Sequence, residues 1–353
     1  MMNADYRRLA GADAADRQDL FVSASRRLGT APQNVEKDFW VCWTLDALFN
    51  GPAAGGPRFL FKGGTSLSKG FGLIERFSED IDITVFRDDL GEDTSVAQLE
   101  AMSGKKRQAK LDAIKVACQQ FIGGPLLAQL STIVAELVEE TGATDSGARV
   151  ELDPDDESQQ SLLLWYPSIT AASDGYIRKA VKIESGAKSA LDPHRPHRIT
   201  PYLADDIEDF DLGIDNVTIV DAERTFWDKV VILHGLRRWF DIRGVLRAGG
   251  QRVSRHYYDV HLLMGAGTGA AALADPALGA DCVAHARMFF NSRDLDLAHA
   301  EPGSFALVPT EAMIVELRRD YTAMAGMVFG TIPSFDDVLA TVVALEARLN
   351  GSP

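Results

Sequence analysis

The sequence FLFKGGTSLSK at residues 59–69, followed by DIDITVF at 80–86, decides the fold that this chain predicts. Residues 58–62 are a short β-prone run that stops at a pair of glycines, and residues 65–72 suit a short helix. Residues 81–86 read as a second strand, with apolar and polar residues alternating at its start. A strand, a glycine turn, a short helix and a second strand therefore open the folded core.

Two acidic residues, Asp80 and Asp82, stand at the start of the second strand. Side chains two positions apart on a strand point to the same face, so we expect both carboxylates on one side of the sheet. Like charges held this close repel, and a divalent cation between them relieves the repulsion. Hard carboxylate oxygens suit Mg²⁺ or Mn²⁺. For the D-x-D pattern alone, an exposed strand with two solvated acids stays open as the alternative.

The glycine turn predicts a site for an anion. A strand that ends in Gly63-Gly64 and leads into a helix leaves backbone N–H groups unpaired and aimed at a ligand. Thr65 and Ser66 add hydroxyl donors. Tight turns need glycine in any case, so the turn alone is weak evidence. Joined to a metal-binding D-x-D strand, however, it predicts a place for the phosphates of a nucleoside triphosphate.

These motifs resemble those of the polymerase-β-like nucleotidyltransferase superfamily, whose signature is a G-[GS] turn, a short helix and a D-x-D strand. Within it, the chain looks like the AbiEii/AbiGii toxin family of abortive-infection toxin–antitoxin systems. The segments that carry this resemblance are EKDFW (36–40), FKGGT (61–65), DID (80–82), ERTFWDK (223–229) and RHYYD (255–259), with DYTAM (320–324) and PSFD (333–336) further on.

The resemblance implies roles for four residues. Asp80 and Asp82 would bind the metals, and Lys229 would contact the nucleotide phosphates. Asp259 would be needed for activity, orienting the attacking hydroxyl or assisting its deprotonation. A surface helix lysine is the alternative for Lys229, and an i,i+4 pair with Arg255 is the alternative for Asp259.

A third metal carboxylate is expected, because the superfamily usually takes one from a later strand. Glu184, at the end of a β-prone run, is the candidate. The alternative is an edge-strand glutamate paired with Lys182 or Lys188. The chain also departs from the family pattern, since its turn is Gly-Gly and 15 residues separate Gly64 from Asp80. This departure leaves the roles of the two hydroxyls after the turn open.

The implied function is a metal-dependent transfer of nucleotides from an NTP to an RNA acceptor, with the tRNA 3′ end as the leading candidate and growth arrest as the outcome. A cognate antitoxin encoded nearby is expected, with or without direct contact. Transfer to a protein hydroxyl and a non-catalytic nucleotide- or RNA-binding module remain alternatives. The intact Asp80, Asp82 and Lys229 weigh against the second of these.

The expected architecture is α+β. Residues 1–220 would form the nucleotidyltransferase core, a mixed sheet flanked by helices, with N-terminal helices up to about residue 50. Residues 221–353 have mostly helical apolar spacing and would form a helical domain. Helices are expected at 104–121 and 125–140, and further strands at 148–152, 161–166 and 176–183. His194 and His197 are expected in a loop, without a metal.

Composition limits how the chain can bind nucleic acid. With 36 basic and 51 acidic side chains, its net charge is −15, which argues against a histone-like, non-specific nucleic-acid binder that relies on many phosphate contacts. A local basic groove stays possible. The segment 236–258 holds six arginines against one aspartate, and a solvated helix face is the alternative interpretation. The candidates for RNA binding are Arg237, Arg238, Arg243 and Arg247.

Three cysteines lie far apart, without C-x-x-C spacing, so neither a disulfide framework nor a thiolate zinc site is expected. The first twenty residues contain acids and no apolar run, unlike a signal peptide. No run of about 18 consecutive apolar residues is present, so no membrane-spanning helix is expected. These features predict a cytoplasmic protein.

Overall fold

The computed structural model describes residues 1–51, 55–74, 76–77, 80–170, 178–247, 253–324, 328 and 331–351. The chain divides into two compact units. The first comprises residues 1–70, 77–94 and 104–220, and the second comprises residues 71–76, 95–103 and 221–353. Two short segments from within 1–220 thus belong to the second, helical unit.

The first unit is built on a seven-stranded sheet with the order β3-β4-β5-β2-β1-β7-β6. In this sheet β2 pairs antiparallel with β1 and parallel with β5, while β1 pairs parallel with β7. The predicted α+β class with a mixed sheet is therefore confirmed. The strands are β1 (Phe59–Lys62), β2 (Asp80–Val85), β3 (Arg149–Leu152), β4 (Ser161–Trp165), β5 (Ala180–Gly186), β6 (His194–Ile199) and β7 (Ile214–Val220).

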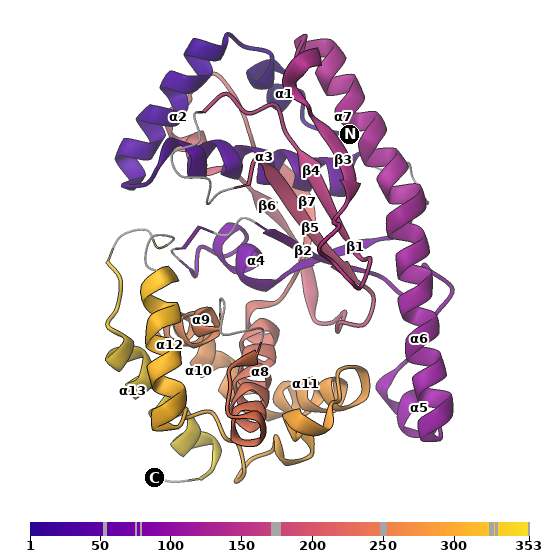
Figure 1. Ribbon diagram of the computed structural model, residues 1–353, viewed down its shortest axis with the longest axis vertical. Helices are drawn as coiled ribbons and strands as arrows, with labels where there is room; N and C mark the ends of the chain where they lie inside the picture. The colour runs from indigo at the N-terminus through magenta and orange to yellow at the C-terminus, as the bar shows by residue number, and fades with distance from the viewer. Residues whose placement is uncertain are drawn as a thin grey trace. The chain divides into compact units, whose positions relative to one another are not determined.

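Helices flank this sheet, as Figure 1 shows. Helix α3 packs on β2, β5 and β7, and residues 34–48 of it are buried almost without interruption. A helix that is covered on all sides carries apolar side chains, or polar side chains that have partners, all around it. Here the sheet covers one face of α3 and other helices cover the rest. The helices of this unit are α1 (Ala4–Ala10), α2 (Ala14–Leu28), α3 (Pro32–Asn50), α4 (Gly63–Lys69), α6 (Gly104–Phe121) and α7 (Leu127–Thr141).

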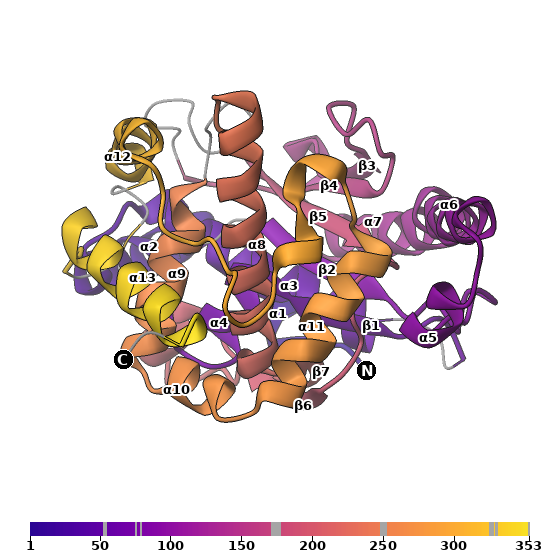
Figure 2. The same cartoon turned by 90° about the horizontal axis from the view of Figure 1, so that it is seen from below.

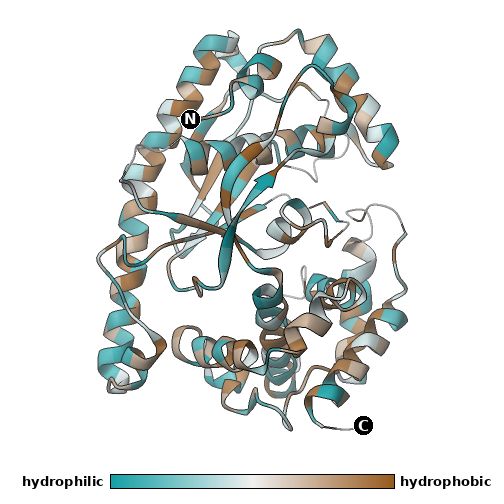
Figure 3. Ribbon diagram, turned by 180° about the vertical axis from the view of Figure 1, so that it is seen from behind, coloured by the Kyte–Doolittle hydropathy of each residue, from teal (hydrophilic) through white to brown (hydrophobic). Residues whose placement is uncertain are grey.

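Helices α6 and α7 join through a π-helical turn at Ile122–Leu126. The turn contains Pro125, whose missing N–H cannot take part in the α-helical bonding pattern. By length and composition alone, the helical run Gly104–Thr141 is apolar enough to cross a membrane, although it contains no run of about 18 consecutive apolar residues. A helix that packs on a protein core can be as long and as apolar. Here α7 packs on β3, and hydrophilic positions interrupt the run along its length (Figure 3).

The second unit is helical. Helix α8 packs against α9, α10 and α11, while α12 and α13 pack against α9, and Figure 2 shows α8 between α9 and α11. The buried side chains of Phe226, Val230 and Leu233 follow the helical spacing that the sequence predicted. The helices are α5 (Val96–Glu100), α8 (Ala222–Arg243), α9 (Ser254–Gly265), α10 (Thr268–Leu273), α11 (Pro276–Phe289), α12 (Glu311–Met324) and α13 (Phe335–Leu349).

Strands β6 and β7 were not among the predicted elements. His194 and His197 were expected in a loop, but both lie on β6, which pairs antiparallel with β7. The prediction was wrong because this segment is polar and contains Pro196, which usually argues against a strand. An edge strand tolerates proline, since one side of it makes no ladder hydrogen bonds, and β6 is the last strand of the sheet.

Candidate active site

The predicted carboxylates lie at the centre of the sheet, on β2. In the pairing register, Asp80 stands opposite Lys182 of β5, and Asp82 stands opposite Glu184 of β5 and Lys62 of β1. Residues directly opposite on neighbouring strands share a face of the sheet. Three carboxylates and two lysines therefore line one face across three adjacent strands.

The other face of the same strands is apolar. Ile81 and Ile83 of β2 are fully buried, as are Phe61 of β1 and Ile183 of β5. The alternation between the two faces is the period-2 pattern that the sequence predicted for this segment. Since the apolar face is fixed in the core, Asp80 and Asp82 have to lie on the opposite, half-buried face.

Gly63 packs directly against the second carboxylate. Its φ is +80°, a backbone conformation that favours glycine. A Cβ atom at this position would lie 2.2 Å from Asp82 Oδ2 and 3.0 Å from Asp82 Cγ. The turn therefore needs glycine for two reasons: its backbone conformation and the space that the Asp82 carboxylate occupies. The glycine turn and the D-x-D strand meet in the folded chain, as the sequence pattern predicted.

The two hydroxyls after the turn contact the backbone. Thr65 Oγ1 donates to the carbonyl oxygen of Asp80 at 2.6 Å, and Ser66 Oγ donates to the carbonyl oxygen of Gly63 at 2.9 Å. Both residues are buried. In this structure the hydroxyls predicted to reach phosphate thus tie α4 to the start of β2 and close the turn.

Glu184 combines the two interpretations that the sequence left open. It lies beside Asp82 on the carboxylate face, and its Oε1 also forms an ion pair with Lys182 Nζ at 3.0 Å. The same ammonium lies 3.2 Å from Asp153 Oδ2. Burial alone lowers the pKa of Lys182, but the two carboxylates outweigh it and raise that pKa. Lys182 is therefore charged and shared between two acids.

The donor chemistry of the carboxylate face suits a hard divalent cation. Among the described residues, no group of three His, Cys, Asp or Glu side chains already converges as a metal site. Asp80 and Asp82 offer carboxylate oxygens from one strand, and the missing Cβ of Gly63 leaves the space that the Asp82 carboxylate occupies. Glu184 is one strand away, with its carboxylate on Lys182. The residues fit a metal ion that Asp80 and Asp82 would hold. Glu184 would become a third ligand if its carboxylate left Lys182.

The motif EKDFW, at residues 36–40, lies on α3 and contributes buried charged side chains to the first unit. Its first three residues, Glu36, Lys37 and Asp38, are charged and at most 2% exposed. Glu36 accepts a backbone N–H bond from Ile169 at 2.7 Å, and Lys37 donates to the carbonyl oxygen of Arg178 at 3.2 Å. These bonds attach Ile169, which follows β4, and Arg178, which precedes β5, to α3.

Asp38 anchors α4. Its carboxylate forms an ion pair with Lys69, the last residue of α4, and accepts the backbone N–H of Tyr202 at 2.7 Å. The Lys69 ammonium also lies 3.2 Å from the centre of the Tyr202 ring. Burial alone lowers the pKa of Lys69, yet Asp38 outweighs it and the pKa is raised. The helix after the glycine turn is thus held by a charged, buried pair.

Lys229 and Asp259 meet within the second unit. Lys229 Nζ lies 2.8 Å from Asp259 Oδ2, and both side chains are buried. Arg76 binds the same carboxylate with two bonds, Nε to Oδ1 at 3.0 Å and Nη2 to Oδ2 at 3.1 Å. The sequence left open a pair between Asp259 and Arg255; the partners are Arg76 and Lys229. Sequence reasoning missed Arg76, which lies 183 residues away and belongs to no motif.

The charges of this cluster compensate one another. Burial raises the pKa of the Asp259 carboxyl, but Arg76 and Lys229 outweigh burial and hold it well below its usual range. For Lys229, burial lowers the pKa, and the neighbouring Asp259 offsets only part of that effect. Asp259 is thus a fully engaged carboxylate, and Lys229 is a buried cation already bound to it.

The candidate RNA-binding arginines lie at the C-terminal end of α8 and just beyond it. Arg237 forms an ion pair with Asp241 at 2.9 Å, and Arg243 forms one with Asp294. Arg238 lies 3.5 Å from Asp296. The guanidinium carbons of Arg243 and Arg247 lie 5.4 and 5.6 Å from the centre of the Trp239 ring.

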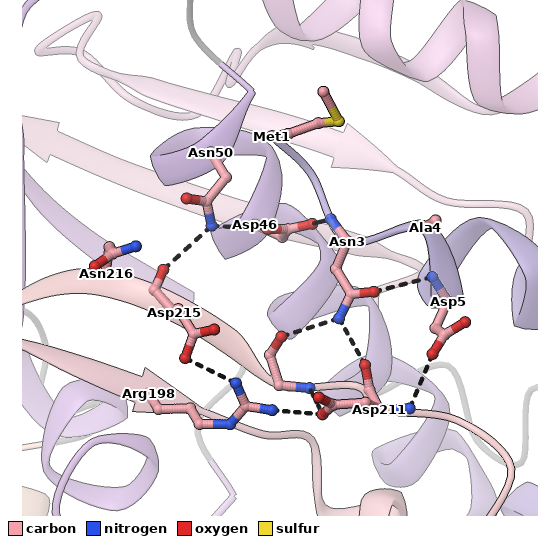
Figure 4. Close-up of a pocket in the computed structure, with 11 residues that line it drawn as sticks. Met1, Asn3, Ala4, Asp5, Asp46, Asn50, Arg198, Asp211, Asp215 and Asn216 are labelled. Atoms are coloured by element: carbon pink, nitrogen blue, oxygen red, sulfur yellow. Dashed lines mark hydrogen bonds and ion pairs between the residues drawn. The ribbon is translucent and has the colours of Figure 1, made fainter.

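A polar cavity of about 500 Å³ lies in the first unit, away from any motif (Figure 4). Within it, Arg198 forms ion pairs with Asp211 and with Asp215. The Asn3 side chain donates to the carbonyl oxygens of Asp211 and Gly213. The polar groups that line this cavity mostly bind one another and hold the first residues of the chain in place.

Comparison with known proteins decides the family. The family model described as "Nucleotidyl transferase AbiEii toxin, Type IV TA system" matches residues 46–341, well over half of the chain. The chain belongs to this family. It is therefore a nucleotidyltransferase enzyme of the AbiEii toxin family of toxin–antitoxin systems. The matched range contains the glycine turn and the D-x-D strand, whereas EKDFW at 36–40 precedes it.

Among solved structures, the chain is similar to MenT4, a nucleotidyltransferase toxin from Mycobacterium tuberculosis H37Rv. The sequence identity is 15%, the match covers 94% of this chain and 97% of that one, and the TM-score is 0.42. The comparison with curated protein sequences finds no significant match.

Proposed function

We propose that this AbiEii-family enzyme uses Mg²⁺ or Mn²⁺ to transfer a nucleotide from an NTP to the 3′ end of an RNA, with tRNA as the acceptor. The observation that carries the chemistry is the contact between Gly63 and the Asp82 carboxylate. It brings the predicted phosphate turn and the predicted metal carboxylates to one place on the sheet. The RNA acceptor, tRNA and growth arrest follow from the family resemblance.

Asp80 and Asp82 are the proposed metal ligands, with Glu184 as the third. When bound, the metal ions neutralise charge on the attacking oxygen, the leaving oxygen and the phosphoryl group between them. The chain's own part is to hold two carboxylates rigidly on β2, whose apolar face is locked into the core. Lys182 holds the Glu184 carboxylate through the ion pair between them.

The turn Gly63-Gly64 is the proposed phosphate-binding element, through its backbone N–H groups. Thr65 and Ser66 are proposed to support it by fixing its shape, as their bonds to the backbone indicate. A rigid turn matters because phosphoryl-transfer catalysis consists mostly of positioning and charge stabilisation.

For Lys229 and Asp259, the resemblance proposes a phosphate contact and an essential carboxylate. The contacts of Asp259 support a positioning role, since both of its oxygens are bound to Arg76 and Lys229. In this role Asp259 offsets part of the effect of burial on the pKa of Lys229 and fixes its ammonium group. Orienting the acceptor hydroxyl would require Asp259 to leave one of these partners.

The acceptor surface is proposed to be the end of α8. Arg243 and Arg247 are exposed and flank the Trp239 ring, an arrangement suited to phosphate contact and base stacking. Arg237 and Arg238 are less exposed, at 25% and 31% of their side chains, and would contribute by exchanging Asp241 for phosphate. Exposed ion pairs of this kind are weak enough to exchange.

The decisive experiment incubates the protein with Mg²⁺, each labelled NTP, and either total RNA or total protein. We expect label in tRNA, and no label after addition of EDTA or with the variant Asp80→Ala. Asp145→Ala, which changes an exposed aspartate of the same unit, serves as the matched control and should transfer normally. Label in protein instead of RNA would overturn the acceptor. Transfer by Asp80→Ala at the wild-type rate would overturn the catalytic site.

A second experiment tests the acceptor surface. RNA labelling should weaken steeply as salt is raised, and the double variant Arg243→Gln/Arg247→Gln should raise the KM for RNA while leaving the KM for NTP unchanged. A flat salt response, or an unchanged KM for RNA, would remove this surface from the proposal. Expression with and without the neighbouring antitoxin gene tests the growth arrest.

A further inference from the structure

One lysine of this region, Lys62, stands where β1 meets the glycine turn. It is the last residue of β1, it precedes Gly63 directly, and it stands opposite Asp82 in the sheet register. Its side chain therefore lies on the carboxylate face, and it is half-buried. The motif FKGGT contains this lysine, but none of the roles assigned so far uses it.

The other lysines around the candidate motifs are already paired. Lys182 is shared between Asp153 and Glu184, Lys229 is bound to Asp259, and Lys69 is paired with Asp38. For the side chain of Lys62, the described part of the chain supplies no hydrogen bond or ion pair. On the face that carries Asp80 and Asp82, Lys62 is thus a cation that no described acid holds.

The charge on this face shows what such a cation is suited to bind. Asp80, Asp82 and Glu184 contribute three negative charges, and the single charge of Lys182 is already divided between Glu184 and Asp153. A triphosphate adds several more negative charges, of which metal ions on the carboxylates offset a part. A lysine beside the turn supplies a compact positive charge on a flexible stem, which suits a phosphate oxygen.

We propose that Lys62 binds the pyrophosphate portion of the incoming NTP, a role that rests on the proposed nucleotidyl transfer. In that reaction the acceptor hydroxyl loses its proton to water, and its oxygen forms a bond to the α-phosphorus. The bond from this phosphorus to the bridging oxygen breaks, and pyrophosphate leaves with the electron pair. The Lys62 ammonium compensates the charge that grows on the leaving group. No proton transfer from the lysine is needed.

The test compares Lys62→Met with Lys62→Arg in the full chain. We expect the Kd for the NTP and the inhibition constant of pyrophosphate to rise about 10-fold in Lys62→Met, the usual cost of losing one charge-assisted contact. Affinity for the nucleoside monophosphate should change less than twofold, because this ligand lacks pyrophosphate. Lys62→Arg keeps the charge and should restore most of the NTP affinity.

Lys188→Met is the matched control. Lys188 is another half-buried lysine of the first unit, and burial lowers its pKa. Its loss should leave all three affinities unchanged. NTP and pyrophosphate affinities of Lys62→Met within twofold of wild type would overturn the proposal, and so would an equal loss of monophosphate affinity.

A measurement on the wild-type chain covers the case in which Lys62→Met does not fold. Acetylation of lysines, followed by mass spectrometry with and without tripolyphosphate in EDTA, should show Lys62 protected and Lys188 not protected. Equal acetylation of Lys62 in both samples would overturn the assignment. If the wild-type chain binds NTP and labels RNA, but neither the Lys62→Met substitution nor tripolyphosphate protection of Lys62 shows an effect, this inference alone fails. If the wild-type chain transfers no nucleotide to any acceptor, the proposed function fails.

Discussion

Replacing Gly63 by alanine is the sharpest test of how the glycine turn meets the D-x-D strand. The substitution adds one methyl group at a φ of +80°, and that methyl group would lie 2.2 Å from Asp82 Oδ2. Rotating the carboxylate does not remove the clash, because Cγ and Cβ of Asp82 are also only 3.0 and 3.2 Å away. The whole side chain of Asp82, or the turn itself, has to move.

The magnitude follows from two costs. An alanine in the left-handed region costs about 1 kcal/mol relative to glycine. Ordinary contact begins near 3.4 Å, so the Asp82 carboxylate must retreat by about 1 Å, and overpacking of this kind costs about 1–3 kcal/mol. We expect Gly63→Ala to lower the free energy of unfolding by about 2–4 kcal/mol. A displacement of about 1 Å at a catalytic group should lower nucleotide transfer about 100-fold.

The assay combines urea unfolding with transfer of labelled nucleotide, at a temperature where both proteins are folded. Gly142→Ala isolates the backbone cost, because Gly142 has a φ of +66° and no atom lies within 4 Å of its added Cβ. It should lose about 1 kcal/mol and keep full activity. Equal losses of stability in the two variants, together with normal transfer by Gly63→Ala, would refute the packing argument.

Three further predictions concern buried charge. Asp38→Asn leaves the ammonium of Lys69 buried without its carboxylate, so urea unfolding should show a loss of about 3–5 kcal/mol, and adding Lys69→Met should recover part of it; no recovery would contradict the pairing. Burial lowers the pKa of His234, whose Nδ1 accepts the N–H of Ala306 at 3.1 Å. Below about pH 6.5 the unfolded chain therefore takes up a proton at His234 while the folded chain does not. As the pH is lowered further, this group should reduce the free energy of unfolding by up to about 1.4 kcal/mol per pH unit. Urea midpoints between pH 7.5 and 5 should show a weaker decline in His234→Gln, and an identical decline would refute the assignment. Asp82→Asn removes one of two like charges, so it should abolish transfer while the free energy of unfolding stays within about 0.5 kcal/mol or rises; a large loss of stability would mean that the carboxylate serves the fold.

Local pattern determined much of this protein. The period-2 alternation of β2 separates Ile81 and Ile83 from Asp80 and Asp82, so the sequence alone predicted which side chains share a face. The turn at Gly63 was also predicted, because a strand that ends in glycines before a helix implies a turn. The helical spacing of α8 predicted its buried residues. These features depend on neighbours along the chain, which the sequence shows directly.

Strands β6 and β7 were not predicted, and only β6 has a composition that argues against a strand. Pro196 and its polar neighbours are allowed on β6 only because it is an edge strand, and a strand's place in the sheet is set by how the whole chain packs. β7, in contrast, contains the β-branched run VTIV at 217–220, a strand signal that was overlooked.

Only the tertiary structure decided which charged groups pair. The sequence could name Asp259, Glu184 and Lys62, but it could not show that Arg76 binds the first or that Asp82 stands between the other two. Such pairs depend on strand register and on packing between segments far apart in sequence, and a register shift of one residue would turn each side chain to the opposite face. The sequence thus determined the residue types and faces of the site, and folding decided which of these charges are already neutralised.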